Sequence, residues 1–550
     1  MTSKEASLSA CIENLHAVND SSTGLNKVYR PTVLSAEKTM TLVYSSSLQK
    51  GNGWKHAISA EEMLQDHTDS QKRIIMNDTF FTQSVLTLTT GVFITGFALK
   101  LHAPAFVIGL LVAIPCLAQL LQLPSVALVA RCASLKNLII RSMFLGRLAL
   151  LSFAVIPFCR NSHAALAALV IFYALYACLS AVSTCAWNAW VRDTINPDEL
   201  GQFFSKKLAL SSLITLLLTF TGGIFIDWGA SYLSKIHTPV YSLLFLFTAL
   251  LGIVGVFPLR KIRENAALHV VKRSNSSELL HDLSNSGIDA SSVMTESSIS
   301  ESSISDSSKG GFLASVRHLF KPFNESNYRN LIKFLTIYDF SINLAIPFLT
   351  VYMLNTLHYS MGLVSAITIA SQLANYFFLP TWGKIADRFS NRSVLMICGP
   401  IQLFCLFAWC VFVLPGVTET TLPFVIAIHV ILGIGTAGVS LANGNIAMKL
   451  SPADRTAPHM ACTNMMASLA SGASPLLTGW ASQNFAHINI GIPGFENSCW
   501  YFIFSFACLL GCIGLVQLTK VEESGTVRTR QLLRDLLIDP FQKHIRHSIS

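Results

Sequence analysis

Three ionisable residues stand deep within long apolar stretches of this sequence: Asp339, Arg147 and His429. A charged side chain is costly in an apolar surrounding, so each one is a candidate functional group. Asp339 could take up and release a proton, or pair with an arginine or with water. Arg147 could bind an anion, or pair with an acid on a neighbouring helix. His429 is better explained as a hydrogen-bonded packing residue.

Uncharged polar residues in the same apolar stretches form a second candidate set. Gln119 and Gln122 are three positions apart, as are Gln372 and Asn375, so each pair shares one face of a helix. Asn343 stands on a further stretch. Such faces line a polar passage between helices, or they hydrogen-bond one helix to another.

The composition indicates what surrounds these residues. Of 550 residues, 52% are hydrophobic and only 13% are charged, whereas soluble proteins carry about 25% charged residues. Several soluble domains could not be covered by so few charges, so most of the chain must lie in lipid. The net charge of +9 is scattered between apolar runs and forms no patch for nucleic acid. Ordinary soluble enzymes, nucleic-acid-binding domains and disulfide-stapled modules are therefore excluded.

The apolar windows and turn signals predict an all-α membrane protein with twelve spans. These are 76–99, 105–128, 138–158, 164–190, 207–226, 240–259, 331–354, 361–382, 393–414, 423–446, 458–480 and 499–518. The domains expected are a mostly flexible tail (1–75), a six-helix bundle (76–259), a polar loop (260–330), a second six-helix bundle (331–518) and a second tail (519–550). Within the loop, the Ser-rich composition of segment 274–308 predicts a disordered tether. The helical spacing of apolar residues in 312–321 predicts an interfacial helix.

Basic residues predict the orientation of the spans, because Lys and Arg collect on the cytoplasmic side. With both termini inside, the loops outside hold only Lys100, Arg160 and Lys235. Asp78 is near enough to the inside boundary to reach water. The cysteines show no metal-ligand spacing, so we expect neither a metal site nor a cofactor.

The two halves of the chain repeat each other. Residues 123–130 (LPSVALVA) align with residues 379–386 (LPTWGKIA), and Asn188 and Pro197 match Asn443 and Pro452 at nearly the same offset. Both matches fall at equivalent places in the two sets of spans. The chain is therefore expected to be a duplicated six-helix unit.

Residues 383–392 (GKIADRFSNR) resemble the loop signature G-x-x-x-D-R-x-x-R/K of the major facilitator superfamily. In that family the signature also follows the second span of a six-helix half, as these residues do here. The resemblance implies two pseudo-symmetric bundles that rock about a central cavity and move a small solute. It further implies a conformational latch in which Asp387, with Gly383 and with Arg388 or Arg392, closes the cytoplasmic side against the helix that begins near Pro197. The first copy lacks this acid, since Arg131 occupies the equivalent position.

The resemblance implies a secondary-active transporter that works by alternating access, with proton symport as the default. It would lie as a monomer in the cytoplasmic (inner) membrane of a bacterium, with a small molecule and protons as its partners. No G-x-x-x-x-G-K-[ST], H-E-x-x-H or G-x-S-x-G motif occurs, so we do not expect an enzyme. Two alternatives remain open: a membrane sensor or receptor that transports nothing, and a drug or metabolite efflux antiporter of the same fold.

Overall fold

The computed structural model describes residues 53–132, 134–194, 197–232, 239–261, 320–412, 421–452, 456–485 and 498–524. It separates into two units, Met1–Ser70 and Gln71–Ser550. The described residues are almost entirely helical, which confirms the all-α prediction. The Ser-rich tether, nearly all of the expected interfacial helix, most of the first tail and most of the second lie outside the described residues.

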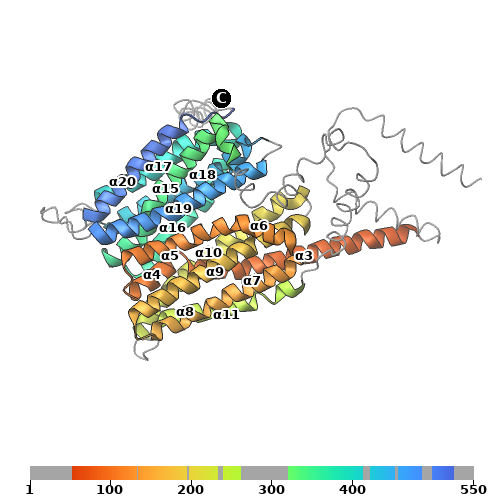
Figure 1. Cartoon of the computed structure of the whole chain (residues 1–550), viewed down its shortest axis with the longest axis horizontal. Coiled ribbons are helices and arrows are strands. Elements are labelled where there is room, and N and C mark those ends of the chain that lie inside the picture. The colour runs from red at the N-terminus through yellow and green to blue at the C-terminus, as the bar shows by residue number, and fades with distance from the viewer. Residues whose placement is uncertain are drawn as a thin grey trace, which may run out of the picture. The chain divides into compact units, whose positions relative to one another are not determined.

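The first half of the chain forms helices that are interrupted at several points (Figure 1). Gly91, at φ 59°, separates the first two, since this backbone conformation suits glycine. The elements are α3 (Gly53–Thr89), α4 (Val92–Lys100), α5 (Ala105–Ala118), η1 (Gln119–Leu121), α6 (Gln122–Arg131), α7 (Leu135–Ala149), α8 (Leu151–Val155), η2 (Ile156–Phe158), α9 (Ser162–Thr194), α10 (Pro197–Tyr232), α11 (Val240–Val254) and η4 (Pro258–Lys261).

The second half consists of a short 3-10 turn and longer helices. They are η5 (Lys321–Asn324), α15 (Ser326–Asn355), α16 (Met361–Arg388), α17 (Asn391–Phe412), α18 (Thr421–Leu450), α19 (Thr456–Phe485) and α20 (Ser498–Leu518).

Ten stretches of the described chain are long and apolar enough to cross a membrane. The remaining two predicted spans are helical as well. The span 105–128 is made by α5, η1 and α6 in succession, and its apolar part, Ala105–Leu121, is shorter. The span 458–480 lies within α19, which carries polar residues such as Asn464 and Ser471. Helices thus occupy all twelve predicted spans, and the chain is an integral membrane protein.

The first helix starts at Gly53, within the segment that was expected to be a mostly flexible tail. Residues 57–65 (AISAEEMLQ) contain several strong helix formers, which explains a helix there despite low hydropathy. A hydropathy window detects the membrane-crossing part of a helix and misses a polar extension of it.

Many large apolar side chains point outward from the helices. Phe377 is 68% exposed, Ile171 63% and Val516 62%. In a soluble protein such a surface would be unfavourable, but lipid tails solvate it. The buried residues of both halves form one extended core, and a smaller cluster around Ile75, Trp187 and Trp190 joins α3, α7, α9 and α10.

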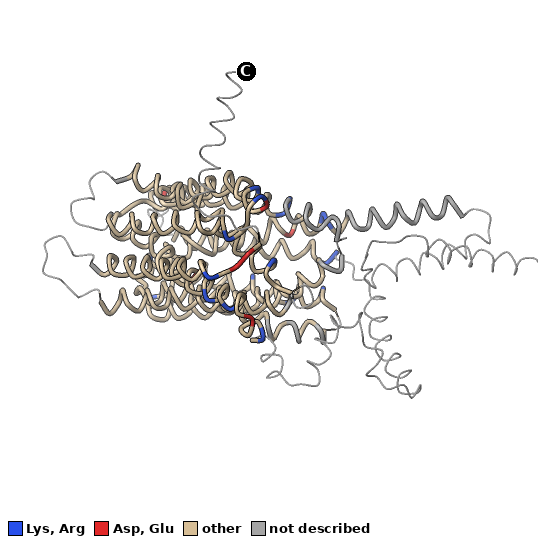
Figure 2. Tube along the Cα trace, turned by 90° about the horizontal axis from the view of Figure 1, so that it is seen from above, with Lys and Arg blue, Asp and Glu red and all other residues tan. Residues whose placement is uncertain are grey.

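Charged residues lie mostly toward one end of the helices (Figure 2). We call this the inner end; it holds Lys384 and Arg388 at the end of α16 and Lys449 at the end of α18. The opposite, outer end holds Lys100 and Arg160 among the described basic residues. The names follow the orientation that the basic residues predict.

Candidate functional site

The two halves of the chain touch closely toward the outer ends of two helix pairs. A β-carbon on Gly109 of α5 would lie 2.2 Å from the backbone oxygen of Pro475 of α19. One on Gly223 of α10 would lie 2.5 Å from Oγ of Ser365 of α16. Only glycine permits such close approach, so the sequence itself provides for tight packing between the halves here.

Toward the inner end of α16, two residues of the predicted latch are loosely surrounded. Gly383 has space around it, because a β-carbon there would meet nothing within 4 Å. Asp387 is exposed and makes no hydrogen bond or ion pair with a described residue of α10. Helix α10 does begin at Pro197, as the predicted latch requires, although the side chains of its first turn lie outside the described set.

Asp339 lies near the middle of α15 and is partly buried. No hydrogen bond or ion pair joins its carboxyl group to any described residue. Asn343, one turn further along α15, donates from Nδ2 to the backbone oxygen of Asp339 at 2.8 Å and to Oγ of Ser471 at 3.2 Å. Ser471 belongs to α19, so this face of α15 is turned toward a helix that also contacts the other half.

Gln119 lies close to the same boundary from the other half. A β-carbon on Gly472, the residue after Ser471, would lie 2.5 Å from the side chain of Leu117, two positions before Gln119. Gln119 is exposed and accepts a hydrogen bond from the amide of Gln122. Asp339 and Asn343 on α15 and Gln119 on η1 thus each belong to an element that packs against α19.

Gln372 and Asn375 lie on α16, the partner of α10. Gln372 is exposed and stands two turns inward from Ser365, on the same helical face. Asn375 is partly buried. Both therefore lie inward of the point where α16 and α10 touch.

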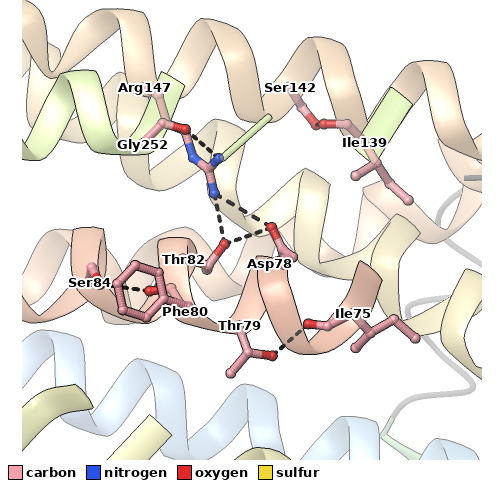
Figure 3. A network of polar contacts seen from close by, with 10 residues as sticks. All are labelled: Ile75, Asp78, Thr79, Phe80, Thr82, Ser84, Ile139, Ser142, Arg147 and Gly252. Carbon is pink, nitrogen blue, oxygen red and sulfur yellow. Dashed lines mark hydrogen bonds and ion pairs between the residues drawn. The ribbon is translucent and has the colours of Figure 1, made fainter. Parts of the chain in front are cut away.

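Arg147 is held inside the first half, away from the boundary (Figure 3). Its guanidinium donates to the backbone oxygen of Gly252 at 2.6 Å and to Oγ1 of Thr82 at 2.7 Å, and it lies 3.8 Å from the carboxylate of Asp78. Thr82 in turn donates to Asp78 at 3.1 Å. The expectation that Asp78 reaches water is wrong, because both Asp78 and Arg147 are only 4% exposed.

His429 is buried on α18, and its contacts are with Val425 and Trp409, not with Asp339. Its Nδ1 lies 2.9 Å from the backbone oxygen of Val425, and its ring meets the indole of Trp409 edge to face. These contacts favour the packing interpretation of this histidine.

The remaining latch residues have partners within the second half. The guanidinium of Arg388 lies over the ring of Phe389, 5.0 Å from its centre. Arg392 donates from Nη2 to the backbone oxygen of Thr519 at 2.9 Å. Its backbone N–H donates to Oε2 of Glu523 at 2.7 Å.

Glu523 is a structural residue that the sequence patterns did not reveal. Its buried carboxylate caps the start of α17 and accepts from the backbone and side chain of Asn391 at 3.2 and 3.0 Å. Lys449, at the end of α18, lies 3.0 Å from the same carboxylate. An acid just after the last span, on a side dominated by basic residues, is the signal that could have revealed it.

Substituting Glu523→Gln should destabilise the second half by about 1–3 kcal/mol, because the buried N–H donors lose a charged acceptor. Burial raises the pKa of Glu523, but hydrogen bonds from Arg392, Lys449 and Asn391 outweigh it and leave the pKa below 4.5. The capping contribution is thus complete above pH 4.5 and is lost as the pH falls through the lowered pKa. Unfolding in detergent between pH 7 and pH 3 measures this. The neighbouring Glu522→Gln should change nothing, and equal pH profiles for Glu523→Gln and the unmutated protein would contradict the assignment.

The described residues contain no group of three His, Cys, Asp or Glu side chains that could hold a metal ion.

Comparison with known proteins finds a family similarity in the second half of the chain. Residues 331–547 match the model of the Major Facilitator Superfamily. A search of curated proteins finds no match.

Several solved structures share the fold at low sequence identity. A mutant of the nucleoside transporter NupG is 12% identical, with a TM-score of 0.57, over 81% of this chain and 99% of its own. A bacterial homologue of the human lysosomal transporter Spinster, solved in an inward-facing and unoccupied conformation, is 14% identical, with a TM-score of 0.56, over 84% and 98%. A D-xylose–proton symporter is 12% identical, with a TM-score of 0.56, over 84% and 98%.

Proposed function

We propose that this protein, a member of the Major Facilitator Superfamily by the sequence of its second half and by its fold, carries a small solute across the membrane by alternating access. One observation carries the proposal: close glycine contacts join the halves toward their outer ends, whereas toward the inner end of α16 Gly383 has space at its β-carbon position and Asp387 is exposed. A transporter whose pathway opens to the cytoplasm has this arrangement. The inward-facing Spinster homologue among the similar structures supports the same interpretation.

We infer that transport is coupled to protons and that Asp339 is the coupling group. Asp78 is paired with Arg147, and Asp227 accepts backbone hydrogen bonds. The carboxyl group of Asp339 has no such partner among the described residues. A carboxyl group that no cation holds charged can gain and lose a proton during transport. The D-xylose–proton symporter among the similar structures supports symport as the mode of coupling.

The solute pathway is proposed to pass the amide side chains near the boundary between the halves: Gln119, Asn343, Gln372 and Asn375. Amides donate and accept hydrogen bonds without charge, which suits an uncharged or zwitterionic polar solute. Arg147 and His429 have internal partners, so we propose packing roles for them instead of solute binding.

The protein is proposed to lie in the cytoplasmic (inner) membrane as a monomer with both termini in the cytoplasm. This orientation rests on the basic residues, which are concentrated at the inner end. It also places the exposed end of α16, with Gly383 and Asp387, on the cytoplasmic side.

Counterflow in proteoliposomes tests the transport proposal without any ion gradient. Vesicles are loaded with one unlabelled compound and exposed to a trace of the same compound with a radiolabel. Amino acids, sugars, nucleosides and organic anions serve as probes. Transient accumulation of one class above the level in protein-free vesicles supports a carrier. Binding of a compound without counterflow would instead favour a sensor.

The latch provides a further prediction. In the outward-open state, Asp387 would face the start of α10, where unpaired N–H groups favour an anion. Asp387→Asn should weaken that state and shift the population toward the inward-open state by about threefold to tenfold. Accessibility of a cysteine placed at Lys384 to a membrane-impermeant reagent, applied to inside-out vesicles, should rise accordingly. Lower accessibility in this variant would argue against the latch.

A further inference from the structure

The outer end of α10 carries an acid that is bound by the backbone of the other half. The carboxylate of Asp227 accepts a hydrogen bond from the N–H of Met361 at 3.0 Å and another from the N–H of Gly362 at 2.8 Å. Met361 and Gly362 are the first two residues of α16. Both oxygens of the carboxylate are therefore engaged across the boundary between the halves.

These bonds complete the N-terminus of a long helix. The first N–H groups of a helix have no acceptor within it. In α16, Oγ of Ser360 accepts a hydrogen bond from the N–H of Leu363 at 3.2 Å. The carboxylate of Asp227 accepts from the two N–H groups that precede Leu363. Helix α16 is thus capped partly by its own half and partly by the other.

The N-terminus of α16 also stabilises the negative charge of Asp227. No Lys or Arg among the described residues forms an ion pair with it, whereas the N-terminus of a 28-residue helix carries a partial positive charge. Charge-assisted hydrogen bonds to backbone N–H groups are stronger than neutral ones.

The packing around the carboxylate requires small residues. A β-carbon on Gly362 would lie 2.5 Å from Oδ2 of Asp227. One turn earlier on α10, a β-carbon on Gly223 would lie 2.5 Å from Oγ of Ser365 and 3.2 Å from Cα of Gly362. The two backbones can therefore approach closely enough for the carboxylate to reach the N–H groups.

We infer that Asp227 is the lock that holds the outer side closed. Opening this side separates α10 from α16, which breaks both hydrogen bonds and leaves two N–H groups and a carboxylate to be solvated. The lock resembles the latch predicted around Asp387, since each places an acid at a helix N-terminus of the other half, but it acts at the opposite end. The inference rests on the alternation in the proposed function and on neither the solute nor the coupling ion.

Distances between spin labels on purified, reconstituted protein test the lock. After replacement of the native cysteines, one label pair (Ala230→Cys with Asn355→Cys) reports the outer end. A second pair (Lys206→Cys with Lys384→Cys) reports the inner end. Double electron–electron resonance then gives the populations of the two states from both pairs.

Asp227→Ala should raise the ratio of outward-open to inward-open molecules about tenfold or more, because it removes two charge-assisted hydrogen bonds from one state only. The outer distance should lengthen as the inner distance shortens. Gly362→Ala keeps the carboxylate of Asp227 but displaces it, so this variant should shift the ratio in the same direction. It also keeps the lock testable if Asp227→Ala fails to fold. Ser231→Ala, one turn further along α10, should leave both distances unchanged.

A wedge variant separates failure of the lock from failure of alternation. Gly109→Trp forces α5 away from α19 at the outer end whether or not Asp227 acts as a lock. If the wedge shifts both distances and neither Asp227→Ala nor Gly362→Ala does, the lock is overturned while alternation stands. If no variant shifts either distance, both the lock and the proposed alternation are overturned.

Discussion

Asp339→Asn is expected to abolish solute-driven proton movement while leaving solute exchange in place. Asparagine keeps the size and hydrogen-bonding capacity of the side chain but cannot exchange a proton. The proposed coupling requires that this one group change its charge, since no described residue pairs with it. In proteoliposomes that contain a pH-sensitive dye, addition of the counterflow solute should acidify the interior with the unmutated protein. With Asp339→Asn the signal should fall at least about tenfold, to the level of protein-free vesicles.

The controls for this prediction separate coupling from folding. Counterflow by Asp339→Asn should stay within about threefold of the unmutated protein, because exchange needs no net proton transfer. Asp339→Glu retains a carboxyl group and should restore part of the proton signal. Glu522→Gln removes an acid outside the spans and should change neither assay. Full proton movement by Asp339→Asn would eliminate Asp339 as the coupling group.

Arg147→Met should destabilise the protein by about 3–5 kcal/mol, because it leaves Asp78 buried without its cation. The substitution also removes the donors to Thr82 and to the backbone oxygen of Gly252, which join α3, α7 and α11 (Figure 3). Chemical unfolding in detergent micelles measures the loss. Arg141→Met removes an exposed arginine from the same helix and should cost no more than about 0.5 kcal/mol.

A double-mutant cycle isolates the ion pair itself. Asp78→Asn combined with Arg147→Met should cost clearly less than the sum of the single changes, since no charge then stays buried alone. If Arg147 bound an anionic solute instead, Arg147→Met would lose counterflow of organic anions and keep its stability. That pattern would contradict the packing role.

The architecture was predictable because it follows from hydropathy and repetition along the chain. Apolar windows located the helices of all twelve predicted spans, ten of which are long and apolar enough to cross a membrane, and the repeated segments around Pro124 and Pro380 indicate two related halves. The start of the first helix at Gly53 was not predictable in this way, since its first turns are polar and carry no hydropathy signal.

The interactions between distant residues were predicted less well. The sequence indicates that Arg147 is a buried charge, but it places Asp78 at a boundary, because span edges drawn from hydropathy do not show how far an arginine side chain reaches. Glu523 and Asp227 both cap helices that are far away in sequence. A helix start can be read locally, whereas the residue that caps it from another helix depends on the packing of the whole fold.

Concentrative uptake by the unmutated protein is the most direct test of secondary-active transport. Proteoliposomes with an alkaline interior are given the radiolabelled solute identified by counterflow. The solute should accumulate inside above its external concentration while the pH gradient lasts, and a protonophore should remove the excess. Uptake that only reaches the external concentration, with or without the gradient, would contradict proton-coupled transport.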